Sequence, residues 1–238
     1  MDYTEDLAVF IDEPVAYSDA TALQERLAED RLADAIPDTI LFLEHLPVIT
    51  LGRRGNTASL LDSPEKLETD GIALITSTRG GDTTYHAPGQ LVTYPIMKLQ
   101  RHEADVHSYV TRLEEVAIRS AAGFGIEAFR RKGMTGVWTH DGKLAAIGVR
   151  LRRWVTAHGM SFNVNIDLTG FERIVPCGLD DRRVVSLASL LGDRCPAFRD
   201  VRESMAAHFA TVFSRTFRTI SCPTLAEAAA QLQGASAQ

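Results

Sequence analysis

Residues 72–97 read IALITSTRGGDTTYHAPGQLVTYPIM and combine two apolar, β-rich runs with a glycine-rich segment between them. The runs 72–77 and 91–97 predict two strands. In the segment 79–90, three glycines permit tight turns and close approach of the backbone to a bound molecule. Arg79, Tyr85, His86 and Gln90 add polar groups that a plain hairpin does not need. We interpret 79–90 as a loop that belongs to a functional site; a simple Gly/Pro connection is the alternative.

The chain before this stretch carries signals for two helices and several strands. Ser18, followed by leucines at 23, 27 and 32, predicts a helix that Ser18 caps. Ser63-Pro64-Glu65 predicts the start of a second helix, which Asp70-Gly71 ends. Strands are predicted at Leu7–Ile11, Thr39–Glu44 and Val48–Leu51, with a basic turn at 52–56.

The chain after this stretch predicts a long helix, a hairpin and two further helices. The hairpin has the turn His140-Asp141-Gly142 between its strands. Helices are predicted at Asp105–Ala122, Val201–Phe213 and Leu225–Leu232, and strands at Val137–Thr139, Lys143–Leu151 and Val155–Ile166, the last three as a meander. Because strands and helices cluster in runs, the predicted fold class is α+β, with a mixed, mainly antiparallel sheet and flanking helices.

Length and composition favour one domain with its own core. The chain has 238 residues, of which 45% are hydrophobic, and we expect a single domain over 1–238. Its motif-bearing core would span about 41–190, with C-terminal helices at 200–233. The net charge of −6 argues against nucleic acid as a partner. The first residues lack a signal-peptide pattern and no apolar run is long enough to span a bilayer, so we expect no membrane partner and a cytoplasmic location.

Two residues carry reactive groups among small neighbours. Lys143 follows the Asp-Gly turn, where a lysine is usually solvated; directed along the sheet, its ammonium group would reach a pocket and donate or transfer protons there. Cys177 lies between Pro176 and Gly178, which suits an accessible nucleophile better than a packed thiol. Most free cysteines are core residues, and we assign Cys195 and Cys222 to the core or the surface. The absence of a CxxC pair indicates no metal site.

In order and content, the motifs of this chain resemble those of the lipoate-biosynthesis octanoyltransferases, which move an octanoyl group from acyl carrier protein to a lysine of lipoyl domains. The resemblance runs from about Leu41 to about Leu190. Its motifs are Glu44-His45-Leu46-Pro47-Val48-Ile49-Thr50-Leu51-Gly52-Arg53, the segment 79–90, Lys143–Gly148, His158–Asn165 and Pro176–Leu179. Together and in this order these motifs are specific, whereas RGG or PCG alone is not.

The resemblance implies the mixed fold of biotin and lipoate protein ligases, and it implies a site. The family's catalytic cysteine falls on Cys177 and its catalytic lysine on Lys143. Its acyl-binding segments fall on Arg79, Gly80, Gly81, Asp82, Thr83, Thr84, Tyr85 and His86, on Ala146, Ile147 and Gly148, and on Gly159, Met160 and Ser161. Two residues depart from the family. Ala87 replaces the usual glycine and is expected to trim the pocket mouth or shift the backbone, and Ser161 replaces a common alanine.

The implied reaction is acyl transfer to a protein amine through a cysteine thioester, without a cofactor or a metal ion. With an ordinary pKa near 8.5, only about 3% of a cysteine is thiolate at pH 7, so a nearby Lys143 ammonium would favour the anion. A neutral Lys143 would then accept a proton from the attacking amine. We expect the acyl tail to lie among Ala146, Ile147 and Phe162, with about 0.8 kcal/mol for each buried methylene. Expected partners are octanoyl-acyl carrier protein as donor, and the lipoyl domains of 2-oxoacid dehydrogenases and the glycine cleavage H protein as acceptors.

Other functions fit parts of the pattern. An ATP-dependent lipoate or biotin protein ligase keeps the lysine and the RGG-type loop but needs no cysteine. A related amidotransferase would move the acyl group between carrier proteins, with glycine cleavage H protein as donor. A non-catalytic module would bind the acyl carrier or the lipoyl domain without transfer.

Acyl carrier protein, the expected donor, is acidic, and this chain is acidic as well. Docking of the donor therefore requires a local cationic surface on this chain. We expect a docking patch among Arg53, Arg54, Arg130, Arg131, Lys132, Arg150, Arg152 and Arg153. Ordinary solvated charge is the alternative for each of them.

Overall fold

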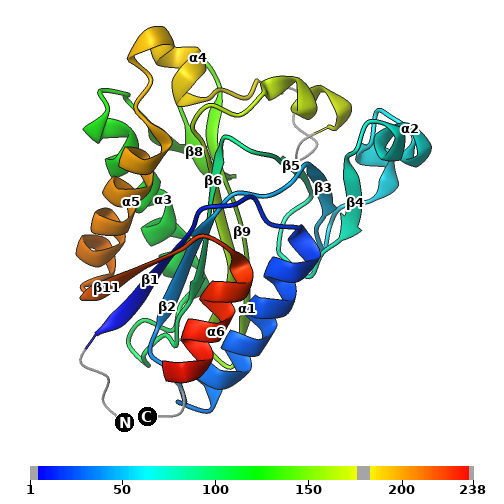
Figure 1. The fold of residues 1–238 in the computed structure, drawn as a ribbon. Coiled ribbons are helices and arrows are strands. Elements are labelled where there is room, and N and C mark those ends of the chain that lie inside the picture. Colours follow the sequence, from blue (N-terminus) through cyan, green and yellow to red (C-terminus); the bar gives the residue numbers. More distant parts are fainter. Residues whose placement is uncertain (1–4, 176–182, 236–238) are drawn as a thin grey trace.

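The computed structural model describes residues 5–175 and 183–235, which form strands in two sheets and helices on both sides of the larger one (Figure 1). The strands are β1 (Asp6–Ile11), β2 (Thr39–Leu43), β3 (Val48–Leu51), β4 (Ala73–Thr76), β5 (Thr83–His86), β6 (Gln90–Ile96), β7 (Phe129–Arg131), β8 (Met134–Trp138), β9 (Lys143–Arg152), β10 (Val155–Asn163) and β11 (Phe217–Cys222). The helices are α1 (Tyr17–Leu32), α2 (Pro64–Thr69), α3 (Val106–Gly123), α4 (Leu187–Leu191), α5 (Phe198–Phe213) and α6 (Leu225–Ala235), with short 3-10 helices at Thr57–Ser59, Leu168–Arg173 and Gly192–Arg194.

The larger sheet has eight strands in the order β11-β1-β2-β6-β10-β9-β8-β7, and the smaller has three in the order β4-β3-β5. The strands β8, β9 and β10 pair antiparallel in sequence order, which confirms the predicted meander. Strand β6 lies antiparallel between β2 and β10, whereas β1 pairs in parallel with β2 and β11. This mixed, mainly antiparallel sheet with flanking helices confirms the predicted α+β class.

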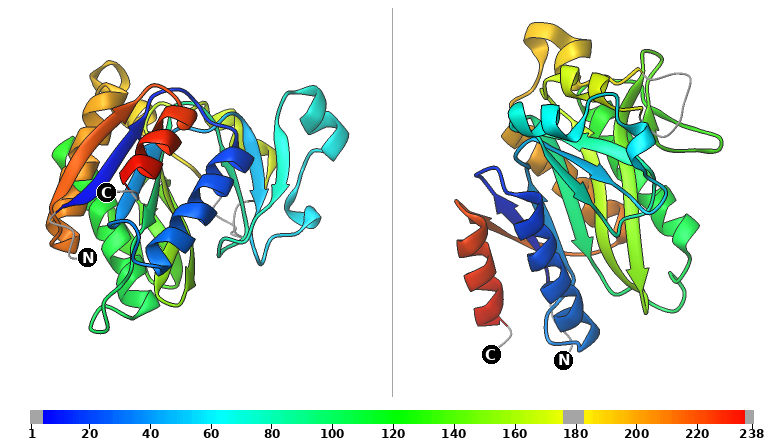
Figure 2. Two further views of the ribbon diagram at one scale, coloured as in Figure 1. Left: turned by 60° about the horizontal axis from the view of Figure 1, so that its bottom comes forward. Right: turned by 90° about the vertical axis from the view of Figure 1, so that its right-hand side faces the viewer.

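Alternation of apolar residues along the central strands gives the larger sheet two buried faces. In β1, Val9 belongs to the apolar cluster under α1 and α6, whereas Phe10 belongs to the cluster under α3 and α5. The same alternation places Leu41 and Phe42 of β2 on opposite faces. Figure 2 shows the resulting layers, with α1 and α6 on one side of the sheet and α3 and α5 on the other. The larger sheet is therefore a rigid base on which a site can be held.

The smaller sheet projects beside the larger one together with α2 (Figure 2). Its strand β3 pairs in parallel with β4 and antiparallel with β5. It has its own apolar cluster, in which Ile49 and Tyr85 pack with Leu67 of α2 and with Ile166 and Ile174. The segment 79–82, which connects β4 to β5, therefore extends from the small sheet toward the larger one.

Two sequence predictions differ from the structure, and some elements were not predicted. The predicted cap Ser18 lies inside α1, because the helix begins at Tyr17 after an extended Ala16 that makes no side-chain cap. The segment 79–90 is not loop throughout, because the β-forming residues 83–86 pair with β3 as β5. The strands β7 and β11 and the short helix α4 were not predicted. By contrast, α2 and α3 begin within one residue of the predicted helix starts, and the side chains of Ser63 and Asp105 cap them by accepting backbone amides.

Within the described ranges, we find no helix that combines the length and the apolar character needed to cross a membrane.

Candidate active site

A cavity of about 350 Å³ lies between the small sheet and the strands β6, β9 and β10. This volume lies within the usual range of small-molecule sites. Of the lining residues, Arg54 and residues 133–135 are exposed to solvent, and they mark the mouth of the cavity. Its inner wall is formed by Tyr17, His86, Tyr94 and His158, all of them buried. The cavity therefore runs from solvent to a buried aromatic wall.

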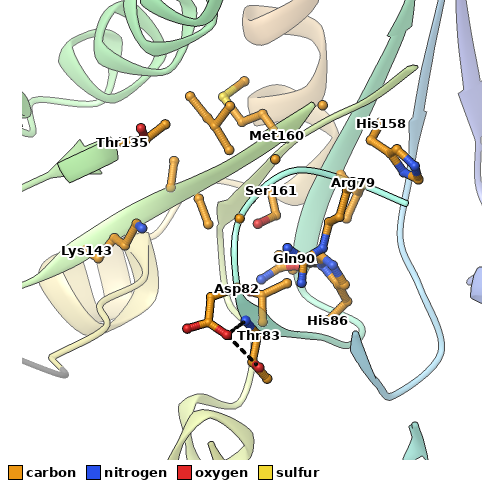
Figure 3. Close-up of a pocket in the computed structure, with 18 of the residues that line it drawn as sticks. Arg79, Asp82, Thr83, His86, Gln90, Thr135, Lys143, His158, Met160 and Ser161 are labelled. Carbon is orange, nitrogen blue, oxygen red and sulfur yellow. Dashed lines mark hydrogen bonds between the residues drawn. The ribbon is translucent and has the colours of Figure 1, made fainter. Parts of the chain in front are cut away.

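Most residues predicted to bind the acyl group line this cavity. They are Arg79, Gly81, Asp82, Thr83, Thr84, His86, Ala146, Ile147, Gly148, Gly159, Met160 and Ser161. In Figure 3, Lys143 extends into the cavity from one side, while Arg79 and His86 lie on the other. The structure thus brings together residues that the sequence separates by up to 82 positions, from Arg79 to Ser161.

Some predicted site residues lie elsewhere. Gly80 does not line the cavity, because its amide faces β9 and donates to the Val149 carbonyl at 3.0 Å. Tyr85 does not line it either, because its ring packs in the apolar cluster of the small sheet and meets Phe171 edge to face, with ring centroids 5.5 Å apart. The predicted nucleophile Cys177, with the rest of the Pro176–Leu179 motif, lies outside the described residues.

Two further expectations about the pocket are wrong. Phe162 does not contact the cavity, because on β10 it points away from Ser161 and into the core under α3 and α5. Ala87 does not trim the pocket mouth, because its methyl group is buried in the cluster of the small sheet beside Ile49 and Ile166. Ser161, the other departure from the family pattern, does line the cavity.

Arg79 is a buried structural anchor as well as a lining residue. Its Nη2 donates to the Thr50 carbonyl at 2.6 Å and to Thr50 Oγ1 at 2.8 Å, and its Nε donates to the same hydroxyl at 3.1 Å. A planar guanidinium makes these bonds to β3 at once, which a lysine ammonium cannot. The side chain therefore ties the segment 79–82 to the small sheet.

Gly148 allows the same segment to rest on β9. A Cβ atom on Gly148 would lie 2.7 Å from the Gly80 carbonyl oxygen and 3.2 Å from Arg79 Cδ. The contact with the Gly80 oxygen is too short for a methyl group, because that oxygen belongs to backbone and cannot swing aside as a side chain could. The turn 52–54 holds the segment from the other side, since the amides of Gly52, Arg53 and Arg54 donate to the carbonyls of Asp82, Arg79 and Gly81 at 3.0 Å each. The segment 79–82, which we call the RGG segment, is therefore fixed between β9 and the turn 52–54 that follows β3.

Lys143 begins β9 and is half-buried at the cavity wall. Its amide donates to the Arg183 carbonyl at 2.9 Å, and its carbonyl accepts from the Val185 amide at 3.0 Å. Its Nζ lies 5.2 Å from the centre of the Trp138 ring, within the range of a cation–π contact. Gly136 makes space for the side chain, because a Cβ there would lie 2.7 Å from Lys143 Cε. Of the two environments that the sequence allows, the structure favours the pocket over bulk solvent.

A buried line of hydrogen bonds crosses the cavity floor from His86 to Val185. His86 Nδ1 donates to Gln90 Oε1 at 2.6 Å, and Gln90 Nε2 donates to Asn163 Oδ1 at 2.9 Å. Asn163 Nδ2 then donates to the Val185 carbonyl at 2.9 Å. Burial, and secondly the neighbouring His45, hold the pKa of His86 well below its usual range, so the ring is a neutral donor. Asn163 was part of a sequence motif, but its role in this line depends on tertiary contacts.

Next to the inner wall lies His45, whose ring centroid is 5.1 Å from that of Tyr17 and 5.6 Å from that of His86, and whose contacts sequence reasoning missed. His45 Nδ1 donates to the Val15 carbonyl at 3.0 Å, and its Nε2 accepts from the Tyr94 hydroxyl at 2.6 Å. Burial lowers the pKa of His45 to about 4, and burial followed by the charge of Arg150 lowers that of His158 to about 4. The pKa of Tyr94 is raised well above its usual range by burial. At neutral pH these side chains of the wall are uncharged, which suits an uncharged ligand.

The part of the chain that the structure describes contains no group of three or more His, Cys, Asp or Glu side chains arranged to hold a metal ion.

Comparison with known proteins agrees with this architecture. The fold is that of lipoate protein ligases: a bi-partite lipoate protein ligase from Thermoplasma acidophilum superposes with a TM-score of 0.74, at 17% identity, over 96% of this chain and 91% of that chain. This likeness confirms the predicted ligase-like fold and concerns the fold alone.

Closer relatives are proteins named octanoyltransferase. The one from Chloroflexus aurantiacus is 49% identical over 203 residues, which cover 84% of this chain and 91% of the relative. The one from Caldicellulosiruptor saccharolyticus is 48% identical over 217 residues, which cover 90% and 92%. The lipoyl protein ligase A/B catalytic domain matches residues 16–210. The chain belongs to this family, which confirms the resemblance drawn from the motifs.

Proposed function

We propose that this chain acts in the cytoplasm, where it takes an octanoyl group from octanoyl-acyl carrier protein and transfers it to the lysine of a lipoyl domain. The transfer proceeds through a thioester on Cys177. That it is an octanoyltransferase of protein lipoylation follows from relatives of that name that are 48–49% identical over most of their length. The observation that carries the site assignment is the convergence of Lys143, the RGG segment and the buried His86–Val185 line on one cavity.

The reaction has two displacement steps. In the first, the Cys177 thiolate attacks the thioester carbonyl, a new S–C bond forms, the bond to the carrier's sulfur breaks, and that sulfur leaves as a thiol with the proton of the Lys143 ammonium, so that Lys143 becomes neutral. In the second, the lysine amine of the lipoyl domain attacks the acyl-cysteine, an amide bond forms, and Cys177 leaves as a thiolate. Lys143 stabilises the thiolate as an ammonium, and in its neutral form accepts the proton that the attacking amine loses. Neither displacement step needs a cofactor.

The properties of the other cysteines support Cys177 as the nucleophile. Cys222 is fully buried in the apolar cluster under α1 and α6, and Cys195 is half-buried against the opposite cluster, so of the two expected environments, core or surface, both lie closer to the core. Burial raises the pKa of each thiol, which lowers the fraction of reactive thiolate. The residues on either side of the PCG motif are held near the site, since Val175 donates to Ser59 at 2.8 Å and Arg183 accepts from Lys143 at 2.9 Å.

The lining of the cavity supports an acyl ligand. Ala146, Ile147, Gly148, Gly159 and Met160 present small or apolar surface to it. Each methylene that becomes buried contributes about 0.8 kcal/mol, which is roughly a fourfold preference in binding. We therefore expect a graded preference for chain length, set by the buried wall at the inner end.

The direct test is transfer from octanoyl-acyl carrier protein to an apo lipoyl domain without ATP, followed by intact mass of the acceptor. We expect one octanoyl group on the lipoyl domain of a 2-oxoacid dehydrogenase or on the glycine cleavage H protein. Acylation from free octanoate that requires ATP would instead support a ligase. Transfer only from octanoylated H protein would support an amidotransferase, and carrier binding without transfer a non-catalytic module.

A further inference from the structure

The cationic residues expected to dock the donor divide into two groups by their ion pairs. Arg130 pairs with Glu114 at 3.1 Å and Glu115 at 2.7 Å, and Arg152 pairs with Glu29. Arg150 lies 3.9 Å from Glu25. These pairs neutralise much of the charge that an incoming anion would meet. Arg130, Arg150 and Arg152 are therefore weaker candidates for the expected docking patch than cations without such pairs.

The second group lies at the cavity mouth. Arg54 is exposed and lines the cavity, and Lys132 is exposed one residue before the lining residues 133–135. Among residues 5–175 and 183–235, no carboxylate lies within 4.0 Å of the side-chain nitrogens of Arg53, Arg54 or Lys132. Within that part of the chain, these positive charges are not neutralised by an ion pair.

Arg54 is held at the mouth by its backbone. Its amide donates to the Gly81 carbonyl at 3.0 Å, and the Gly55 amide closes the turn on the Gly52 carbonyl at 2.8 Å. The base of the side chain is thus fixed beside the RGG segment, so less conformational freedom is lost when the guanidinium binds a ligand.

Lys132 is presented from the other sheet. It forms with Gly133 the tight turn between β7 and β8, where Arg131 and Met134 are paired across the hairpin. Met134 is 36% exposed and lines the cavity directly after this turn. An extended ligand that enters between Arg54 and Lys132 would therefore meet cations from both sheets and an apolar side chain beside them.

We propose that Arg54 and Lys132 bind the phosphate of the phosphopantetheine arm that carries the donor's acyl thioester. This inference rests on the proposed function, and it specifies which part of the donor the mouth recognises. The acyl chain is uncharged and matches the uncharged wall, so the phosphate is the anionic group nearest to it on the donor. Guanidinium and ammonium groups are the side-chain groups that favour phosphate. Arg54 and Lys132 place such groups at the cavity mouth although the net charge of the chain is −6.

The test compares three donors in transfer to an apo lipoyl domain: octanoyl-acyl carrier protein, octanoyl-phosphopantetheine and octanoyl-pantetheine, which lacks the phosphate. Arg54→Ala and Lys132→Ala should each raise the KM for both phosphate-bearing donors by up to about fivefold, and the double variant by about tenfold or more. The KM for octanoyl-pantetheine and the kcat should stay unchanged. Arg152→Ala removes an equal charge from an ion pair outside the cavity and should change none of the three.

Two outcomes would overturn the proposal. An equal rise in KM for all three donors would show that the cations do not recognise phosphate. A rise for the carrier protein alone, with octanoyl-phosphopantetheine unaffected, would place their contact on the carrier's protein surface. Failure of the wild-type chain to use any donor would count against the proposed function instead, so the two failures are distinguishable.

Discussion

The amide of Val185 donates a hydrogen bond of 3.0 Å to the carbonyl of Lys143. The carbonyl of Val185 accepts one of 2.9 Å from the buried Asn163 side chain. Val185 therefore links the strand that presents Lys143 to the hydrogen-bonded floor of the cavity. The position of Lys143 therefore depends on the buried Asn163 side chain as well as on its own strand.

Asn163→Asp should weaken this link. The aspartate keeps an acceptor for Gln90 Nε2 but loses the donor to Val185, which leaves a buried carbonyl facing a carboxylate. We expect the free energy of unfolding to fall by about 2 kcal/mol and the rate of octanoyl transfer to fall with it. The matched control is Asn165→Asp, because the Asn165 side chain is exposed on the same segment. Denaturant unfolding that gives equal values for the two variants would refute the link.

Gly148→Ala should displace the RGG segment. The added methyl group would overlap the Gly80 carbonyl, which lies 2.7 Å from the position of a Cβ atom. We expect the KM for the octanoyl donor to rise roughly tenfold, because the covering segment must move away from β9. Gly123→Ala is the control, since a Cβ there would lie 3.9 Å from its nearest neighbour, Ser204 Oγ. Steady-state kinetics at wild-type values for Gly148→Ala would contradict the packing described here.

Stability should fall in mild acid because of the buried histidines. The pKa of His45 in the folded chain is lowered to about 4 by burial, so the unfolded chain binds this proton at a higher pH. The stabilisation is fully present above a pH of about 6.5 and is lost as the pH falls toward about 4. We expect a loss on the order of 2 kcal/mol from His45 between pH 7 and pH 5. Asp6 acts in the opposite sense, because burial raises its pKa to about 6.

The measurement that isolates His45 is the difference in unfolding free energy between wild type and His45→Gln across this pH range. Glutamine can keep a donor to Val15 and an acceptor for Tyr94. The difference should shrink as the pH falls. A pH-independent difference for His45→Gln would mean that this ring does not titrate below its ordinary range.

Lys143→Ala should make the nucleophile harder to ionise. If the ammonium group stabilises the Cys177 thiolate, its removal should raise the pH midpoint of Cys177 alkylation, followed by mass of the labelled peptide. Lys66→Ala removes an exposed lysine that is paired with Asp70 at 2.8 Å and should leave the midpoint unchanged. An unchanged midpoint in Lys143→Ala would rule out the ion-pair role.

Local signals were sufficient to predict much of the fold. The caps at Ser63 and Asp105 and the Asp-Gly turn before Lys143 lie next to the elements that they define. The strand β5 was missed because its pairing with β3 is not local and its flanking glycines indicate a loop. The strand β11 was missed for a similar reason, since it pairs in parallel with β1 from the other end of the chain.

The site residues that belong to sequence motifs could be predicted. The RGG segment, Lys143 and the residues around Gly148 and Gly159 were identified from sequence, and the structure places them around one cavity. Tyr17 and Tyr94 of the inner wall were not, because Tyr17 reaches the cavity only through the packing of α1 against the larger sheet and Tyr94 lies within a predicted strand without a motif. The burial of Ala87 in the small sheet likewise depends on tertiary contacts that residue type does not indicate.

The most direct test of this account is the mass of the chain after incubation with octanoyl-acyl carrier protein in the absence of an acceptor. We predict one added octanoyl group that maps to the peptide containing Cys177, is lost in Cys177→Ala and persists in Cys195→Ala. Addition of an apo lipoyl domain should then remove it from the chain and place it on the acceptor lysine. A wild-type chain that stays unmodified while it still octanoylates the acceptor, or a Cys177→Ala variant that becomes acylated, would contradict the covalent route.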